Sequence, residues 1–435
     1  MNYYSLNGDT TKVNFREAVL NSIAPDKGLY FPEDISKLSP SIIKDITQLT
    51  KHELCYEAIK QFVGDCIPKE KLISIIQETL NFETPVKKVN NEISVLELFH
   101  GPTLAFKDVG ARFMAKCLGY FLENSNKEIT VLVATSGDTG GAVAHGFYKV
   151  KGIKVVILYP KGKVSNIQEK QLTTLGENIY AFEVEGDFDD CQNIVKQAFI
   201  DKEINKQFNL TSANSINVAR WLPQMFYYLN ALQQVDQSKE TIFSVPSGNF
   251  GNICAGIMAQ NIGIKINHFI AATNNNNVVT RFLDSNLYQP LKTIPTISNA
   301  MDVSDPSNFV RIQKIYSNYL NLKEHLTSYS FNDLETRNSV KSVFENDKYM
   351  MDPHGAVAFM GVKKYLEGKE ITQTNNVFLE TAHPVKFIEV VEDILNIKVK
   401  ISTELQDLVK KDKKTIESSS NYLEFKNKLI DLIQL

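Results

Sequence analysis

Short apolar runs alternate with longer amphipathic stretches through the middle of the chain. The short runs are rich in Val, Ile and Phe, which is typical of buried strands. We predict strands at residues 93–98, 128–134, 154–159, 178–185, 241–246, 267–273 and 377–381. Apolar positions recur at helical spacing between them, at residues 106–124, 142–150, 189–204, 252–263 and 386–395. This alternation predicts an α/β fold of mainly parallel, twisted sheets with helices on both faces.

The two ends of the chain carry mainly helical patterns. LSPSIIKDITQL and IPKEKLISIIQETL begin at a proline or a short polar cap, as helices do. We therefore expect a helix-rich N-terminal module at 1–85 and a core of two α/β subdomains at 86–385. A helical insertion is expected at about 305–375, and further helices at 386–435.

Composition narrows the class of protein. Of the 435 residues, 43% are apolar and 22% are charged, and the net charge is −3, so nothing favours nucleic acid or an anionic membrane as a partner. The five cysteines form no C-x-x-C pair, which fits a reducing compartment. The N-terminus does not resemble a signal peptide, and no apolar run is long enough for a membrane span. The histidines lack metal-ligand spacing, so we expect no metal. Together with the cysteines and the N-terminus, these features predict a cytoplasmic enzyme.

The segment SVPSGNFGN (244–252) reads as a strand, a glycine-rich turn and the start of a helix. Ligands bind at this edge of open α/β sheets, and Gly248 and Gly251 allow a close approach of the backbone to an anion. An ordinary turn between a strand and a helix explains the same residues. The spacing matches neither the dinucleotide nor the P-loop motif, so a dinucleotide-dependent oxidoreductase has little support.

Two further loops follow predicted strands. ATSGDTGGA (134–142) offers three hydroxyls and free helix amides that can hold a carboxylate, although a tight turn capped by Asp138 is an equally good interpretation. HGPTLAFKD (100–108) places Lys107 beside apolar residues. Most lysines are solvated surface residues. Partial desolvation at this position would lower the pKa of Lys107, as a Schiff-base lysine requires.

At this point the chain resembles the threonine synthases, a family within the β-family (fold type II) of pyridoxal-phosphate enzymes. The resemblance runs nearly from end to end. It rests on the segments YYSLNG, APDKGLYFPE, LELFHGPTLAFKD, ATSGDTGGAVAH, VVILYPKGKVS, NSINVARWLPQ, SVPSGNFGN, SNAMDVSDPSN and LETAHPVKF. One departure is Lys27, where the family has a second glycine, and it lies away from the predicted catalytic loops.

The resemblance implies pyridoxal 5'-phosphate as the cofactor and Lys107 as the catalytic lysine that carries it. It implies that Thr381 bonds the pyridine nitrogen. Asp138 would lie near the cofactor 3′-oxygen, where many relatives have asparagine. The residues implied to hold the cofactor phosphate are Gly248, Asn249, Phe250, Gly251 and Asn252.

The resemblance also implies two substrate contacts. The ATSGDTGGA loop would bind the α-carboxylate through Thr135, Ser136, Gly137 and Thr139. The NSINVAR segment would bind a terminal phosphate through Asn214, Ser215, Asn217 and Arg220. An arginine suits this role because its planar fork meets phosphate oxygens bidentately.

The implied activity is that of a carbon–oxygen lyase that catalyses the last step of threonine biosynthesis. O-phospho-L-homoserine and water would give L-threonine and phosphate by γ-elimination and β-addition of water, in a monomer or weak homodimer. The alternatives are another β-family lyase, such as a threonine or serine dehydratase or a phospho-amine lyase, and a non-catalytic paralogue. A dehydratase has no need of the NSINVAR phosphate site. A paralogue would tend to lose the lysine or the phosphate loop, and both are present.

Overall fold

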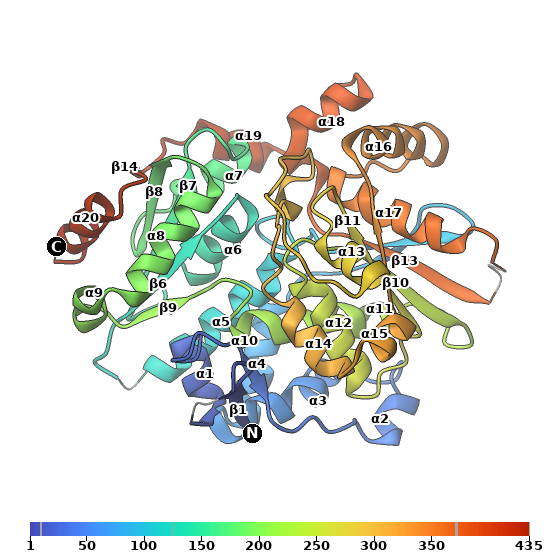
Figure 1. Ribbon diagram of the computed structural model, residues 1–435, viewed down its shortest axis with the longest axis horizontal. Helices are drawn as coiled ribbons and strands as arrows, with labels where there is room; N and C mark the ends of the chain where they lie inside the picture. Colours follow the sequence, from blue (N-terminus) through green and yellow to red (C-terminus); the bar gives the residue numbers. More distant parts are fainter. Residues whose placement is uncertain (9–10, 124, 370–372, 435) are drawn as a thin grey trace.

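The computed structural model describes residues 1–8, 11–123, 125–369 and 373–434. Two large sheets lie side by side, with helices between and around them (Figure 1). One has six strands in the order β12-β11-β10-β13-β5-β4, and the other has five in the order β14-β8-β7-β6-β9. Only the pair β4–β5 among the described strands of these sheets is antiparallel. The predicted α/β fold with mainly parallel sheets is confirmed.

Each of the seven predicted strands has a counterpart in the two large sheets, which among the described residues also contain four strands that the apolar runs did not predict. In the six-stranded sheet they are β4 (Val86–Lys88), β5 (Ile93–Glu97), β10 (Glu240–Pro246), β11 (His268–Thr273), β12 (Leu326–Ser330) and β13 (Thr374–Glu380). In the five-stranded sheet they are β6 (Ile129–Ala134), β7 (Ile153–Pro160), β8 (Ile179–Glu185), β9 (Leu210–Ser212) and β14 (Thr415–Ser419).

The helices follow the strands in the expected alternation. Those before residue 240 are α1 (Phe15–Asn21), α2 (Pro40–Lys44), α3 (Lys51–Val63), α4 (Lys69–Thr79), α5 (Lys107–Leu122), α6 (Asp138–Phe147), α7 (Asn166–Thr173), α8 (Phe188–Ile200), α9 (Lys202–Gln207), α10 (Val218–Trp221) and α11 (Met225–Leu232). Those after it are α12 (Gly251–Asn261), α13 (Val278–Ser285), α14 (Phe309–Tyr316), α15 (Tyr319–His325), α16 (Asp333–Asp347), α17 (Pro353–Leu366), α18 (Ile388–Leu395), α19 (Thr403–Lys410) and α20 (Tyr422–Gln434). Short 3₁₀ turns lie at η1 (Gly64–Cys66), η2 (Leu222–Gln224), η3 (Asn299–Met301) and η4 (Pro384–Phe387).

The N-terminal part contains a small sheet besides its helices. β1 (Asn2–Ser5) pairs antiparallel with β2 (Val13–Asn14) and with β3 (Tyr30–Pro32). Strands this short give almost no alternation, so the hydrophobic pattern cannot show them. The helix α3 is capped by Thr50, whose hydroxyl accepts the Glu53 amide in a capping box.

Three further differences from the predicted elements have local causes. The single helix expected at 189–204 is two helices, because the carboxylate of Asp201 caps the start of α9. The expected helical insertion contains the strand β12, and the expected helical tail contains the strand β14. Both strands lie at a sheet edge with one pairing partner, so their sequences need not be strongly apolar.

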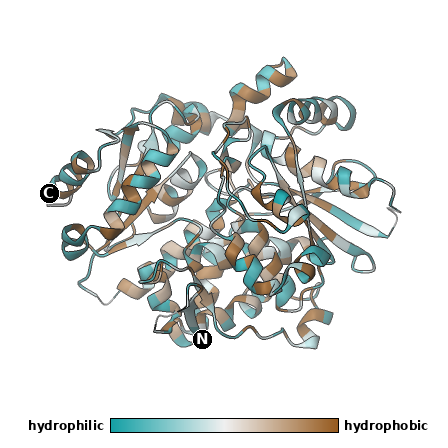
Figure 2. Ribbon diagram, in the orientation of Figure 1, coloured by the Kyte–Doolittle hydropathy of each residue, from teal (hydrophilic) through white to brown (hydrophobic). Residues whose placement is uncertain are grey.

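The core is continuous from the N-terminal part through the helices between the sheets. Figure 2 shows the interior strands mostly brown, whereas outer helices such as α8 and α16 also carry teal residues. None of the helices within the described residues is long and apolar enough to cross a membrane. The C-terminal ends of β5, β13 and β10 lie together in one sheet, and β6 ends in the other sheet.

Candidate active site

A cleft lies where the loops after β5, β6, β10 and β13 meet the start of α10. Most of the predicted site residues line this cleft. They are Lys107, Thr135, Ser136, Asp138, Thr139, Asn214, Ser215, Arg220, Gly248, Asn249, Phe250, Gly251, Asn252 and Thr381. Gly137 and Asn217 lie next to it without lining it.

The segment before Lys107 is held by the chain that follows β13. The Phe106 amide donates to the Thr381 carbonyl at 2.8 Å, and the His383 amide donates to the Leu104 carbonyl at 3.0 Å. Leu104 has a φ of +59°, a conformation that a branched side chain adopts at a cost. These contacts set Lys107 at the first position of α5, facing the cleft.

The amine of Lys107 is largely desolvated, with 19% of the side chain exposed. Burial lowers the pKa of Lys107, and the ammonium of Lys386 and the guanidinium of Arg220 lower it further. The Asp138 carboxylate opposes this shift, with its Oδ2 atom 3.7 Å from the Lys107 Nζ atom. The site therefore shifts the Lys107 amine toward its neutral form, which acts as nucleophile and base.

The loop after β10 is shaped for an anion. A Cβ atom on Gly248 would lie 2.7 Å from the Cα atom of Met301, so only glycine fits there. Phe250 turns the chain with a φ of +58°, and the first-turn amides of α12 then face the cleft as free donors. The buried Nδ2 atom of Asn252 has no partner within the described residues. These donors fit the phosphate group of pyridoxal phosphate.

The turn after β6 is organised by one hydroxyl. Thr135 Oγ1 accepts the amides of Gly137 at 2.9 Å and of Gly140 at 2.8 Å. Gly137 has a φ of +137°, and the Gln168 side chain fills the space of its missing Cβ. Thr135 thus shapes the turn, while Ser136 and Thr139 also line the cleft.

Asp138 lies between two lysines at the start of α6. Its Oδ1 atom is 2.8 Å from the Nζ atom of Lys386 and accepts from Gln168 Nε2 at 2.9 Å. Burial alone would raise the pKa of Asp138. The charges of Lys386 and Lys107 outweigh burial and hold the pKa well below its ordinary value, so Asp138 is a carboxylate.

The NSINVAR segment brings a buried cation to the cleft. Arg220 is 3% exposed, its Nε atom has no partner among the described residues, and burial lowers its pKa to about 10. Ser215 lies against the glycine loop, since a Cβ on Gly251 would be 3.3 Å from the Ser215 Cβ. Asn217 instead caps α10 and donates to the Val19 carbonyl at 2.9 Å, so its amide is already used.

The sequence patterns missed several residues around the cleft. Lys386 lies in LETAHPVKF and His354 lies at the start of α17, where no catalytic spacing marks them. His354 Nε2 accepts the Ala300 amide at 3.1 Å and so holds the loop that closes on Gly248. The one signal available for Lys386 was that it lies in LETAHPVKF, a segment that resembles the family. A pairing such as Lys386 with Asp138 appears only in three dimensions.

Comparison with known proteins agrees with this geometry. A family model described as pyridoxal-phosphate dependent enzyme matches residues 78–381. Models of the threonine synthase N terminus and of the threonine synthase C-terminal part match residues 2–80 and 355–430. The threonine synthase of Escherichia coli strain K12 is 42% identical over 410 residues, which cover 94% of each chain. The chain belongs to the threonine synthase family.

Solved structures of threonine synthases have the same fold. The crystal structure from Escherichia coli superposes with a TM-score of 0.93 at 39% identity, covering 99% of this chain and 100% of that one. The pyridoxal-phosphate-bound structure from Brucella melitensis has a TM-score of 0.91 at 30% identity, covering 99% and 98%. The fold is therefore that of fold type II, and pyridoxal phosphate is the cofactor of this threonine synthase family member. A dehydratase activity is not favoured.

Proposed function

We propose that the chain converts O-phospho-L-homoserine and water into L-threonine and phosphate, as a pyridoxal-phosphate-dependent carbon–oxygen lyase. The observation that carries this proposal is the buried guanidinium of Arg220, which lines the cleft without an acidic partner among the described ion pairs. A buried cation of this kind calls for an anion. The glycine loop already offers donors to one phosphate, so Arg220, Asn214 and Ser215 are assigned to the substrate phosphate.

Lys107 is assigned both to attachment of the cofactor and to proton transfer. When bound, pyridoxal phosphate supplies an electron sink for charge that develops on the substrate carbon atoms. The Nζ atom of Lys107, once free, takes the proton from Cα and later one from Cβ. Burial lowers the pKa of this amine and so makes the neutral form, which accepts a proton, easier to reach than for an exposed lysine.

The remaining groups orient the substrate. Ser136 and Thr139, with the first amides of α6, are assigned to the α-carboxylate, because a helix N-terminus attracts an anion. Arg220 holds the phosphate as it leaves Cγ and stabilises the charge that develops on it. Thr381 is assigned to the pyridine nitrogen; as a neutral hydroxyl it does not favour a protonated ring. Water then adds at Cβ, the two protons taken from Cα and Cβ return to Cγ and Cα, and the proton that the water loses goes to the released phosphate, which gives threonine.

A direct assay tests the reaction. The purified, cofactor-loaded protein is incubated with O-phosphohomoserine, and threonine and phosphate are measured together. Equal amounts of both products are expected, and the Lys107→Ala variant is expected to form neither. Release of 2-oxobutyrate from threonine without threonine formation would show a dehydratase instead.

The cofactor attachment has its own test. Borohydride treatment of the loaded protein is expected to fix the cofactor to the peptide that contains Lys107, detected by mass spectrometry. A fixed cofactor on a different lysine would contradict the assignment of Lys107. The assignments of Gly248, Asn249, Phe250, Gly251 and Asn252 to the cofactor phosphate predict loss of cofactor retention rather than loss of substrate affinity when they are changed.

We also propose the domain division into 1–85, 86–385 and 386–435, because the family models divide the chain in a similar way. The five cysteines are free thiols, which supports action in the reducing cytoplasm. A monomer or weak homodimer is proposed as the working form. Sedimentation at several protein concentrations distinguishes this from a stable larger assembly.

A further inference from the structure

Lys386 is a fully buried lysine beside the catalytic lysine, and it lies in the short turn η4 that follows the last strand of the six-stranded sheet. Its side chain is 0% exposed. Its Nζ atom donates to the Thr103 carbonyl at 2.8 Å and pairs with Asp138 Oδ1 at 2.8 Å. Burying an ammonium group is costly unless it is paired, so this position needs a specific reason.

The carboxylate of Asp138 is shared unequally between two ammonium groups. Its Oδ1 atom is 2.8 Å from Lys386, whereas its Oδ2 atom is 3.7 Å from Lys107. Gln168 Nε2 donates to the same Oδ1 atom at 2.9 Å. The carboxylate is therefore fixed on the side of Lys386 and makes only a long contact with Lys107.

The other charges near this triad come from several elements. Arg220 of α10 faces Lys107, and Asp108 of α5 faces Lys386 while accepting two hydrogen bonds from Thr103. The charge of Lys386 also lowers the pKa of His145 of α6. Asp138 is the one carboxylate that forms an ion pair with either Lys107 or Lys386 in the described part of the chain.

We propose that Lys386 is a positioning residue of the catalytic centre: its ion pair with Asp138 keeps that carboxylate from closing on Lys107, so the Lys107 amine stays available. The proposal rests on the role assigned to Lys107 under the proposed function. Without Lys386, the Asp138 carboxylate is free to turn toward Lys107 and hold it as an ammonium ion.

Two physical effects act in the same direction. The positive charge of Lys386 itself disfavours a second positive charge on Lys107, and it also neutralises Asp138, which would otherwise favour that charge. Loss of Lys386 removes both effects. A nearby opposite charge shifts a pKa by about one to three units, so the expected change is large enough to measure.

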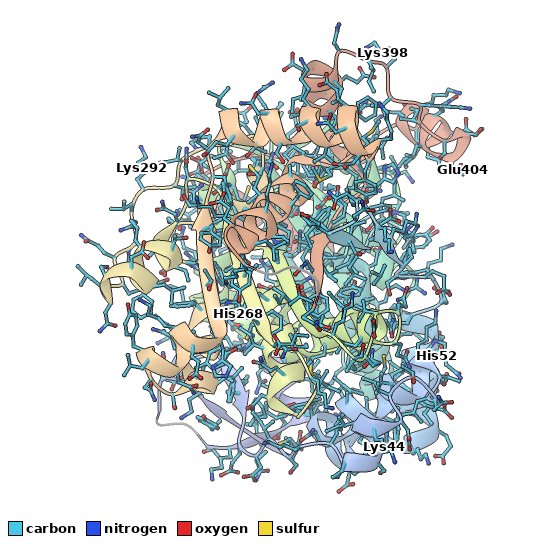
Figure 3. The ribbon with its side chains drawn as sticks, turned by 90° about the vertical axis from the view of Figure 1, so that its right-hand side faces the viewer. Lys44, His52, His268, Lys292, Lys398 and Glu404 are labelled. Carbon is cyan, nitrogen blue, oxygen red and sulfur yellow. The ribbon has the colours of Figure 1, made fainter. Side chains whose placement is uncertain are left out.

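The test measures the reactivity of Lys107 in the full-length chain after removal of the cofactor, so it does not depend on any substrate. The protein is labelled with trace acetic anhydride at a series of pH values, and each lysine peptide is quantified by mass spectrometry. Lys398, which is 91% exposed and points into solvent in Figure 3, is the internal reference. The pH midpoint of Lys107 labelling is the quantity compared.

Three variants give different expected results. Lys386→Met is expected to raise the Lys107 midpoint by about one pH unit or more. Asp138→Asn is expected to lower it, because the attracting charge is lost. The double variant, which removes both charges of the Lys386–Asp138 pair, is expected to have a Lys107 midpoint below that of Lys386→Met and to be more stable than it. Lys426→Met is the matched control, since Lys426 is 14% exposed and pairs with Asp201 and Glu203, and none of these three residues lines the cleft.

The outcomes separate the proposal from a merely structural role. An unchanged or lowered midpoint in Lys386→Met would overturn it, as would a double variant with the same midpoint as Lys386→Met. If Lys386→Met does not fold, the Asp138→Asn and double variants are compared with the unchanged protein. Equal pH midpoints of Lys107 labelling in all three proteins would overturn the proposal. A protein that makes no threonine but shows the expected shifts would refute the proposed reaction, while the effect of Lys386 on the Lys107 amine would still hold.

Discussion

The guanidinium of Arg311 lies 4.3 Å from the centroid of the Trp221 ring, at a point where three segments of the chain meet. Arg311 is fully buried and donates to the carbonyls of Tyr30 at 3.1 Å and Ile216 at 2.6 Å, and to Asn308 Oδ1 at 2.7 Å. One side chain thus joins the N-terminal part, the NSINVAR segment and the loop before α14. The Trp221 ring covers the guanidinium face, where no hydrogen-bond acceptor is needed.

Replacing Arg311 with Met is expected to lower the free energy of unfolding by about 3 kcal/mol or more, because several buried acceptors lose their donor at about 1–3 kcal/mol each. Urea denaturation measures this change. Arg337→Ala is the control, since Arg337 is 39% exposed and makes a surface ion pair worth at most about 1 kcal/mol. A change in Arg311→Met no larger than in the control would show that these contacts do not stabilise the fold.

Replacing Arg220 with Ala is expected to reduce kcat/KM for O-phosphohomoserine by the equivalent of about 2–5 kcal/mol, the usual effect of removing a buried charge that binds a ligand charge. The absorbance of the bound cofactor should remain, because the glycine loop is intact. Steady-state kinetics and an absorbance spectrum test the two parts. Kinetics equal to those of the unchanged protein would remove Arg220 from the phosphate site.

Replacing Gly248 with Ala is expected to weaken cofactor binding, because the new Cβ would lie 2.7 Å from the Met301 Cα atom and 3.1 Å from the Ala300 carbonyl oxygen. Backbone at both contacts must shift, which costs about 1–3 kcal/mol. Fluorescence titration with pyridoxal phosphate gives the affinity. Gly119→Ala is the matched control, because its Cβ would meet only the end of the Val150 side chain, at 3.3 Å. Equal affinities in both variants would contradict the crowding argument.

The stability of the protein is expected to fall below about pH 6.5, partly because of His145. Burial lowers the pKa of His145 from its ordinary 6.5 to about 4. The folded state therefore favours the neutral ring. The unfolded chain binds the proton first, so the contribution of His145 is present above pH 6.5 and is lost as pH falls toward 4.

The variant His145→Gln isolates this contribution. Between pH 6.5 and pH 5 the unchanged protein should lose about 1.5 kcal/mol more unfolding free energy than the variant, from a shift worth 1.36 kcal/mol per unit. Urea midpoints at several pH values measure the difference. Parallel stability curves for the two proteins would show that His145 titrates normally in the fold.

Sequence patterns predicted the parallel strands well because those strands are buried on both faces and read as unbroken apolar runs. β6, β7 and β10 are examples, and their ends agree with the predicted ranges to within one residue. Edge strands and very short strands did not give this signal. β14 and β2 were therefore missed, since neither needs a strongly apolar sequence.

Local sequence also predicted which loops line the cleft, because glycine, hydroxyl and lysine residues after a strand have local consequences. Phe250 illustrates this, since its φ of +58° turns the chain into α12, whereas Gly248 is required by the close approach of Met301, which only the fold brings near. Resemblance to a known family added the cofactor, which no spacing in the chain specifies. The Asn217 side chain shows the limit of such transfer, because its hydrogen bonds to Val19 and Ser212 are visible only in the fold.

By itself, then, the sequence determined the strand–helix order, the glycine-rich turns after β6 and β10 and the lysine at the start of α5, because each depends on residues close together in the chain. Only the tertiary structure decided which charges act on Lys107. Asp138 and Lys386 are separated from it along the chain by other strands and helices, and Coulomb interactions depend on distance in space. The desolvation that tunes the amine likewise arises only when the loops of both sheets close around it.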